Sequence, residues 1–224
     1  MAGLVTVTEP TIEPVSRIEA REHLRLDDDV DDAQVRAYIT AARVYVENFT
    51  GRALINRTMR QFLDGARGGI GTYWEGTRQG PSLTADGDFI EIAASPVFSV
   101  SSIKYYDDAD TAYTWNSANY YVDTAQDVGR VVLRDGGVFP TDLRAANGLE
   151  INFTAGYGTS PTNIPEAIRV AVLQMMTFFY EHRGDFERFP PPKPPAVINS
   201  LLQPYRMMRF GTHPFSKMMK TGIG

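Results

Sequence analysis

One stretch of the chain can only form a buried helix. Residues 163–183 read NIPEAIRVAVLQMMTFFYEHR. The apolar residues recur at spacings of three and four and make two adjacent rows, Ile168, Val172, Met175 and Phe179 in one and Leu173, Met176 and Tyr180 in the other. An apolar surface wider than one stripe has to be covered on more than one side. The sequence therefore predicts a central helix near residues 164–183.

Two further helices are predicted before it. Ser16 and Glu19 have the spacing of a capping box, which predicts a short helix over residues 16–25. Residues 32–50 carry an apolar face, made of Val35, Ile39, Ala42, Val46 and Phe49, while Arg36, Arg43 and Glu47 lie off that face. Gly51 is expected to end this helix. The helices near 16–25, 32–50 and 164–183 are expected to form a small bundle, with 32–50 packed on 164–183.

Between these helices the pattern changes to short strands separated by Asp, Gly, Asn and Pro. The predicted strands span residues 58–63, 89–93, 100–106, 113–116, 120–123, 129–134 and 149–154. Residues 4–15 are expected to be extended. The fold class is therefore α+β, with a mostly antiparallel β region inserted at about residues 56–155. Residues 64–87 are rich in glycine and are expected to be a long loop, but no phosphate-binding motif is present.

The C-terminal part of the sequence has a different composition. Five prolines within residues 190–195 favour an extended spacer, and residues 196–202 can form a short helix that ends before Pro204. From Arg188 onward there are six basic residues and no acidic one, so the net charge of −5 divides into −11 before this point and +6 after it. We therefore expect a body over residues 1–187 and a basic C-terminal arm over 188–224 that docks on an acidic partner.

The composition excludes several kinds of protein. The chain has no cysteine, which rules out disulfides, thiolate zinc sites and a cysteine nucleophile. The N-terminus lacks the pattern of a signal peptide, and no stretch is long and apolar enough to span a bilayer, so a cytosolic protein is expected. His23, His182 and His213 are far apart and have no second ligand at metal spacing. Residues 27–32 begin like a calcium loop but lack its glycine and its closing glutamate.

No catalytic motif and no cofactor site is recognisable, and the chain is expected not to be an enzyme. A hydrolase that uses scattered carboxylates stays an open alternative. The strands carry an aromatic cluster, Tyr105, Tyr106, Tyr113, Trp115, Tyr120 and Tyr121. Cross-strand packing is the favoured explanation of this cluster. The second explanation is a sugar-binding platform, as in a carbohydrate-binding or receptor-recognition module.

Three stretches together resemble the head–tail connector (adaptor) proteins of long-tailed bacteriophages and gene transfer agents. They are residues 14–55, residues 153–173 (FTAGYGTSPTNIPEAIRVAVL) and residues 201–206 (LLQPYR). Their order and spacing carry the resemblance, which covers the two helical ends and leaves the β region poorly matched. The loop at 64–87 and the residues beyond Arg206 are longer than this family leads us to expect.

The resemblance implies a structural virion protein of the neck, made in the cytoplasm of the host bacterium. Such a protein forms a ring, expected to hold twelve copies, beneath the portal protein and receives a tail-side neck or stopper protein on its other face. DNA passes through the lumen without sequence-specific binding, and no membrane is involved. The expected portal-docking residues lie in the C-terminal arm: Leu201, Leu202, Tyr205, Arg206, Arg209, Phe210, Phe215, Lys217 and Lys220.

Overall fold

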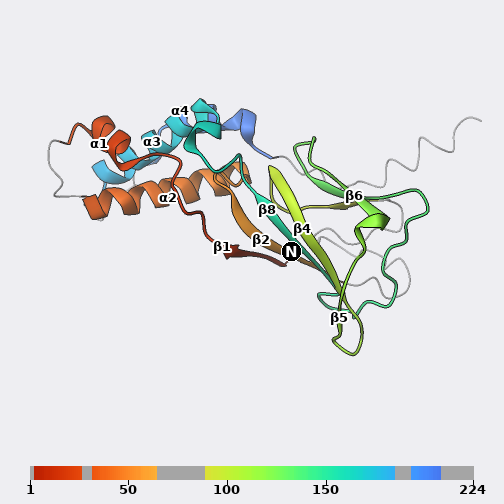
Figure 1. Cartoon of the computed structure of the whole chain (residues 1–224). Helices are drawn as coiled ribbons and strands as arrows, with labels where there is room; N and C mark the ends of the chain where they lie inside the picture. Colours follow the sequence, from red (N-terminus) through yellow and green to blue (C-terminus); the bar gives the residue numbers. More distant parts are fainter. Residues whose placement is uncertain (1–2, 27–31, 65–88, 185–192, 208–224) are drawn as a thin grey trace, which may run out of the picture.

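The computed structural model describes residues 3–26, 32–64, 89–184 and 193–207 of the 224-residue chain. It has a helical part at one end and a β part at the other, and the β4–β5 hairpin points away from the helices (Figure 1). Each part has its own cluster of buried hydrophobic residues. The predicted α+β architecture, a helical bundle with an inserted β region, is confirmed.

The helical part contains four helices among the described residues. They are α1 (Arg17–Leu24), α2 (Asp32–Thr50), α3 (Glu166–Glu181) and α4 (Ala196–Leu202). Ser16 caps α1, since its side chain accepts a hydrogen bond from the backbone N–H of Glu19 (3.2 Å). The Glu19 carboxylate accepts from Arg169 of α3 (2.6 Å). The predicted capping pair therefore both starts α1 and ties it to α3.

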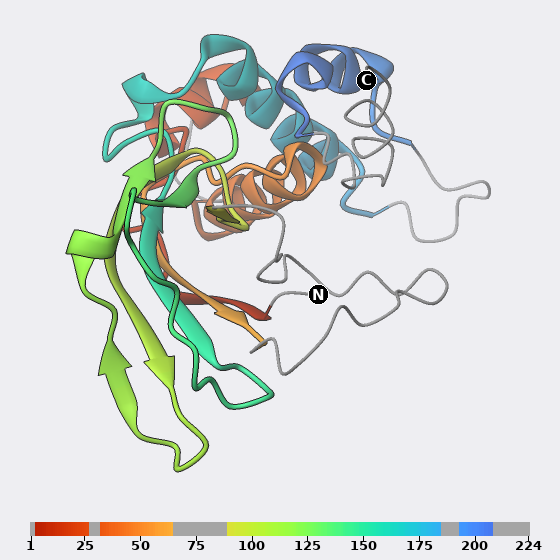
Figure 2. The ribbon, with the colours of Figure 1, turned by 90° about the vertical axis from the view of Figure 1, so that its right-hand side faces the viewer.

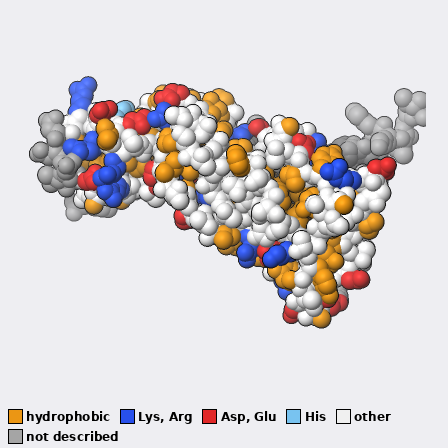
Figure 3. Space-filling view, in the orientation of Figure 1, with side chains coloured by type: hydrophobic (Ala, Val, Ile, Leu, Met, Phe, Trp, Pro, Cys, Tyr) orange, Lys and Arg blue, Asp and Glu red, His pale blue; other side chains and the backbone are white. Residues whose placement is uncertain are grey.

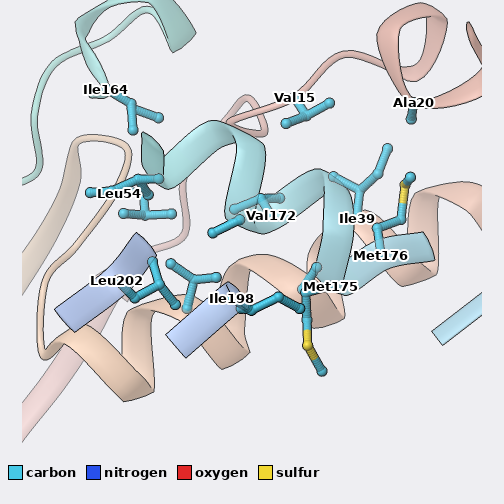
Figure 4. Packing of buried hydrophobic residues seen from close by; sticks show 14 of the residues in the cluster. Val15, Ala20, Ile39, Leu54, Ile164, Val172, Met175, Met176, Ile198 and Leu202 are labelled. Carbon is cyan, nitrogen blue, oxygen red and sulfur yellow. The ribbon is translucent and has the colours of Figure 1, made fainter. Parts of the chain in front are cut away.

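The central helix α3 is covered on several sides, as its wide apolar surface predicts. It contacts α1, α2 and α4. Ile168, Val172 and Met175 of α3 are buried with Ile39 and Val46 of α2 in the helical core (Figure 4). Phe179 lies nearer the helix end and is only partly buried. Burial of each such large side chain contributes about 1.5–3 kcal/mol to folding.

The β part consists of two antiparallel sheets. The strands are β1 (Gly3–Thr8), β2 (Arg57–Leu63), β3 (Phe89–Glu91), β4 (Val97–Tyr106), β5 (Ala112–Thr114), β6 (Tyr120–Asp123), β7 (Arg130–Leu133) and β8 (Leu149–Ala155). The five-stranded sheet has the order β1-β2-β8-β4-β5, and the three-stranded sheet has the order β3-β7-β6. All seven predicted strands are present, with ends shifted by at most three residues. Figure 2 shows the larger sheet curving away from the helices.

The core of the β part lies between these two sheets. Ile151 and Phe153 of the central strand β8 are fully buried there with Ile90 of β3 and Val131 of β7. Gln61 of β2 is buried as well, and it joins the sheets because its amide accepts from Ala93 N–H (2.7 Å) and donates to the Glu91 carbonyl (3.1 Å). A buried amide with both ends satisfied fixes how the sheets meet.

The glycines of the GYG segment allow the end of β8 to pass close to the connection between α2 and β2. Gly156 has φ +144°, and a Cβ atom there would collide with the backbone of Asn56. Gly158 has φ +156°, and a Cβ atom there would collide with the Asn163 side chain. Asn163 belongs to the capping box of the short 3-10 helix Pro161–Asn163 just before α3. This stretch therefore needs glycine to bring the β part onto the start of the central helix.

Candidate functional site

The structure places the predicted docking residues in three different environments. Leu202 is fully buried in the helical core, whereas Leu201 and Tyr205 are partly buried against it. Arg206 is exposed. The remaining predicted docking residues, Arg209, Phe210, Phe215, Lys217 and Lys220, lie outside the described residues.

The short helix α4 is part of the helical bundle. Ile198 and Leu202 lie four residues apart on one face of α4, and both are 0% exposed (Figure 4). They join the core that α2 and α3 form, and α4 contacts both of these helices. The sequence predicts this helix correctly but assigns it to an arm that starts at residue 188. The structure instead has residues 196–207 lying on the body.

Arg52 holds the end of the described chain in place. It lies two residues after the end of α2, and its side chain is 8% exposed. The guanidinium donates to the Tyr205 carbonyl (2.6 Å), to the Asp127 carboxylate (2.8 Å) and to the Ser95 hydroxyl (3.5 Å). An arginine that donates through several N–H groups at once fixes geometry that a lysine ammonium does not reproduce. Arg52 thus joins three segments that are distant in the sequence.

Two further contacts hold the chain next to this arginine. The backbone N–H of Met207 donates to the Thr50 carbonyl (2.8 Å), and the Arg206 guanidinium lies 5.6 Å from the centre of the Phe49 ring. Burial raises the pKa of the nearby Tyr157 hydroxyl, although the positive charge of Arg52 acts to lower it. Residues 205–207, the last described ones, are therefore held at a defined position at the C-terminal end of α2. We call this position, built from Arg52, Thr50 and residues 205–207, the exit site.

Replacing Arg52 with alanine should loosen the exit site. The variant loses a charged donor to the Tyr205 carbonyl, an interaction type that contributes about 1.5–3 kcal/mol. We expect faster amide hydrogen exchange in residues 196–207 and unchanged exchange in β8. Arg52→Lys is the matched control, and it should give an intermediate rate. Equal exchange in Arg52→Ala and the parent chain would show that Arg52 does not hold this segment.

A second buried ionic group connects the helical part to the β part. The Glu47 carboxylate accepts from Arg43 (3.1 Å), from Arg57 (3.0 Å) and from the backbone N–H of Leu54 (2.9 Å). Arg43 also pairs with Glu13 (2.8 Å). The sequence pattern predicts Arg43 and Glu47 off the apolar face, but both are buried. They are buried because Arg57 and Glu13, which approach from outside the helix, complete their pairing.

The outer face of the five-stranded sheet is polar and well paired. Glu150 of β8 accepts from the Tyr106 hydroxyl (2.7 Å) and from the Asn152 amide (2.8 Å), and it forms an ion pair with Arg60 (3.2 Å). Burial, the largest influence, raises the pKa of Glu150, but these hydrogen bonds and the charges of Arg60 and Lys104 together hold it below its usual range. This group stabilises the sheet and leaves no free nucleophile or base.

The aromatic residues of the strands do not form one exposed platform. Tyr105 and Tyr113 stack across β4 and β5 with ring centres 5.3 Å apart. Trp115 is 4% exposed, packs on Tyr120 (4.7 Å) and Phe139 (5.4 Å), and donates its indole N–H to the Val138 carbonyl. Tyr121 lies apart from these residues, near Arg134. Cross-strand packing therefore explains the cluster, and no observation favours the sugar-binding alternative.

No metal-binding group of His, Asp or Glu occurs among the residues that the structure describes. His182 contacts the Phe178 carbonyl (2.9 Å), His23 is exposed, and His213 lies outside the described residues. Of the acidic run at 27–32 only Asp32 is described, and it pairs with Arg17 and Arg36. In the described part of the chain, no helix is long and apolar enough to cross a membrane.

The surface seen in Figure 3 carries acidic and basic side chains side by side, with hydrophobic side chains scattered between them. Large single-sign patches are the usual footprint of nucleic-acid binding, and this face has none. The distinctive features of the described chain are therefore the exit site around Arg52 and the buried ionic group around Glu47. These features position segments relative to one another and do not build a reaction centre.

Part of the chain is similar to a known family of phage proteins. Residues 18–81, which contain α1, α2 and β2, match a family described as phage gp6-like head-tail connector protein. The match confirms the resemblance that the sequence predicts. No curated protein sequence matches the chain significantly.

Solved structures extend the likeness to nearly the whole chain. One is a chain from the neck of an empty GTA particle computed with C6 symmetry. It is 25% identical, the match covers 94% of this chain and 98% of that chain, and the TM-score is 0.69. A chain from the virion of a native gene transfer agent (GTA) particle is 24% identical, with the same coverage and a TM-score of 0.70. A chain from the neck of a native GTA particle computed with C12 symmetry is 24% identical over 95% of this chain and 98% of that chain (TM-score 0.65).

The exit site is the feature that sequence reasoning missed. Arg52 follows a glycine at a helix end and belongs to no motif. Its partner Tyr205 is 153 residues away in the sequence. The LLQPYR stretch drew attention to the correct C-terminal residues but indicated a partner protein as their contact. Their observed contacts in the described chain are with α2 and α3 of the same chain.

Proposed function

We propose that this chain is a structural, non-enzymatic head–tail connector subunit in the neck of a tailed phage or phage-like particle. The observation that carries the proposal is the likeness of 94% of the chain to a chain in the neck of a GTA particle, with a TM-score of 0.69. The match of residues 18–81 to the connector family supports it independently. Copies of the chain form a ring between the portal protein and a tail-side neck protein.

The ring part of the proposal rests on symmetry. The neck structures with similar chains were computed with C6 and C12 symmetry. Closed cyclic assemblies need a head-to-tail interface between two different surfaces of each copy. We propose twelve copies of this chain, in keeping with the twelvefold symmetry of one of these necks.

DNA passes through such a ring without being held. The chain has 27 acidic and 22 basic residues, and residues 1–187 carry a net charge of −11. A surface of this charge does not neutralise phosphates or release counterions, so it contributes no affinity for the passing duplex. The proposal therefore includes a lumen that lets DNA slide and reads no sequence.

We also propose that the portal-docking arm begins after the exit site. The body then extends to Met207, and residues 208–224 form the arm. Arg206, Arg209, Phe210, Phe215, Lys217 and Lys220 supply the docking groups, because aromatic and arginine side chains tend to dominate interface energy. Leu201, Leu202 and Tyr205 instead hold the root of the arm on its own subunit, as their burial indicates.

Electron microscopy of the particle tests the connector role. We expect symmetric density for this chain at the portal vertex, between the portal protein and the tail. An isolated monomer in solution is compatible with the proposal, because the portal can template the ring. Density for this chain on the capsid surface or at the tail tip would rule the proposal out.

A deletion of residues 208–224 tests the arm. Because the cut falls beyond Met207, the helical core stays complete, and we expect unchanged thermal stability and at least a tenfold loss of incorporation into particles. A variant with residues 208–224 in scrambled order keeps the charge and composition and is the matched control. It should also fail, since docking needs the order of the aromatic and basic residues. Normal incorporation of the deletion variant would contradict portal docking by this arm.

A further inference from the structure

The five-stranded sheet has two open edges that carry neither charged residues nor proline. Its outer strands are β1 and β5, and among the described residues no strand lies beyond either of them. Leu4, Val5 and Val7 of β1 are exposed, Val5 by 50%, and all three residues of β5 are exposed. Natural proteins protect such edges with lysine, proline or other charged residues. The sequences GLVTVT of β1 and AYT of β5 contain none of these.

The smaller sheet provides a comparison within the same chain. Its edge strands are β3 and β6, and each carries an acidic residue, Glu91 in β3 and Asp123 in β6. In β1 the only irregularity is a shift of register between Thr6 and Thr8, which leaves Gly3–Thr6 regular. The edges of the larger sheet therefore carry no charged residue against pairing, whereas each edge of the smaller sheet carries one.

We propose that β5 of one copy of this chain pairs with β1 of the next copy, so that the large sheets join side by side around the assembly. The inference rests on the ring of the proposed function and assigns two surfaces to its head-to-tail contact. The edges lie on opposite sides of one sheet, as a cyclic interface requires. Every neighbouring pair in the order β1-β2-β8-β4-β5 is antiparallel, so β1 and β5 run in the same direction.

The side chains of the two edges also match. Leu4 pairs in register with Gln61, and Tyr113 pairs with Tyr105, so both belong to the face of the sheet that covers the core. Val5 pairs with Arg60, and Thr114 pairs with Lys104, which places both on the outer face. A continued sheet sets Leu4 beside the neighbour's Tyr113 and sets Val5 beside its Thr114 or Ala112. Neither contact buries a charge, and each covers an exposed apolar side chain.

Cysteine cross-linking tests this contact in a chain that has no cysteine of its own. The double variant Val5→Cys with Thr114→Cys places one thiol on each edge, and Val5→Cys with Ala112→Cys covers the adjacent register. Four strand spacings of ~4.8 Å put the two edges about 19 Å apart within one copy. A disulfide needs Cα atoms within about 7 Å, so every bond must join two copies. Val5→Cys with Val138→Cys, at another exposed valine, is the matched control.

The cross-links are read by gel from oxidised particles that carry the variant chain. We expect a ladder of dimers, trimers and larger species from one of the two edge pairs, at least tenfold above the control pair. Dimers from Val5→Cys alone would mean that β1 pairs with another β1, and the inference would be wrong. It would also be wrong if the chain occupied the neck and neither edge pair cross-linked, although the connector role would stand. Absence of the chain from the neck would overturn the connector role and this inference together.

A charge at the edge provides a second test. Val5→Lys introduces the residue that natural edges use against pairing. We expect it to lower incorporation into particles about tenfold while leaving the melting temperature unchanged. Val138→Lys carries the same change at an exposed valine away from both edges, and it should incorporate normally. Normal incorporation of Val5→Lys would contradict pairing at β1.

Discussion

Replacing Glu47 with alanine is expected to lower the free energy of unfolding by about 3–5 kcal/mol, because it breaks a buried ion pair: the partly buried Arg57 loses this carboxylate, and Arg43 keeps only Glu13. The Glu47 side chain is 6% exposed, and Arg43 and Arg57 donate to the same carboxylate oxygen at 3.1 and 3.0 Å. Its other oxygen accepts from the backbone of Leu54 (2.9 Å). A loss of this size is a large fraction of the 5–15 kcal/mol that typically stabilises a domain.

Urea unfolding of three variants checks this expectation. Glu47→Gln keeps an acceptor for the Leu54 N–H but removes the charge, so its loss should be smaller than that of Glu47→Ala. Glu166→Ala is the exposed control, since Glu166 also pairs with an arginine, Arg169, but its side chain is 73% exposed. Exposed pairs contribute about 0–1 kcal/mol. If Glu47→Ala and Glu166→Ala unfold at the same urea concentration, the buried pair does not stabilise the chain.

The position of this ionic group explains why a large effect matters for a connector. Glu47 is in the last turns of α2, Leu54 lies in the connection to the sheet, and Arg57 begins β2. Glu13, in the segment between β1 and α1, reaches the group through Arg43. A subunit that, as we propose, pairs with its ring neighbours through the sheet and docks on the portal through an arm rooted on the helices has to keep the two parts in a constant relation. We infer that Glu47 maintains this relation at the junction.

The local structure was largely predictable from the sequence. The helices α2 and α3 follow apolar spacings of three and four, α1 follows the capping-box spacing of Ser16 and Glu19, and Gly51 ends α2 with φ +72° as expected. The strands follow alternating patterns between Gly, Asp, Asn and Pro. Such signals lie within a few residues of one another, so a single sequence contains them. The fold class could be predicted because these local elements occur in a definite order along the chain.

What could not be predicted depends on contacts between distant segments. Arg43 and Glu47 lie on the flank of α2, and a helical pattern assigns such residues to solvent. Their burial depends on Arg57 and Glu13, which the pattern of one helix does not include. Likewise, no local signal places Arg52 near Tyr205, or β1 beside β2 at the edge of the sheet. The candidate exit site is built entirely from contacts of this kind.

The position of α4 is an instructive case. The prolines at 190–195 favour a spacer, and a spacer predicts that the following helix lies away from the body. The spacing of Ile198 and Leu202 predicts a helix with one apolar face but does not say which surface covers that face. The covering surface exists only once α2 and α3 have packed together. The same two residues could therefore be read as partner contacts or as core residues until the structure was known.

The variant Leu202→Ala distinguishes these two roles. In the structure Leu202 is 0% exposed among α2, α3 and the α2–β2 connection (Figure 4). Removal of a leucine side chain from such a site costs about 2–5 kcal/mol, through lost burial and the cavity left behind. We therefore expect the free energy of unfolding of the isolated chain to fall by this amount.

Val197→Ala is the matched control on the same helix, since Val197 is 49% exposed and its truncation should change stability by less than about 0.5 kcal/mol. The two roles of Leu202 then predict different results. A core residue destabilises the isolated chain when truncated, whatever partner is present. A docking residue leaves the isolated chain as stable as the Val197→Ala control and weakens only incorporation into particles. The second result would require α4 to leave the core on docking, and the arm would then begin before Ala196, with the exit site broken in the assembled particle.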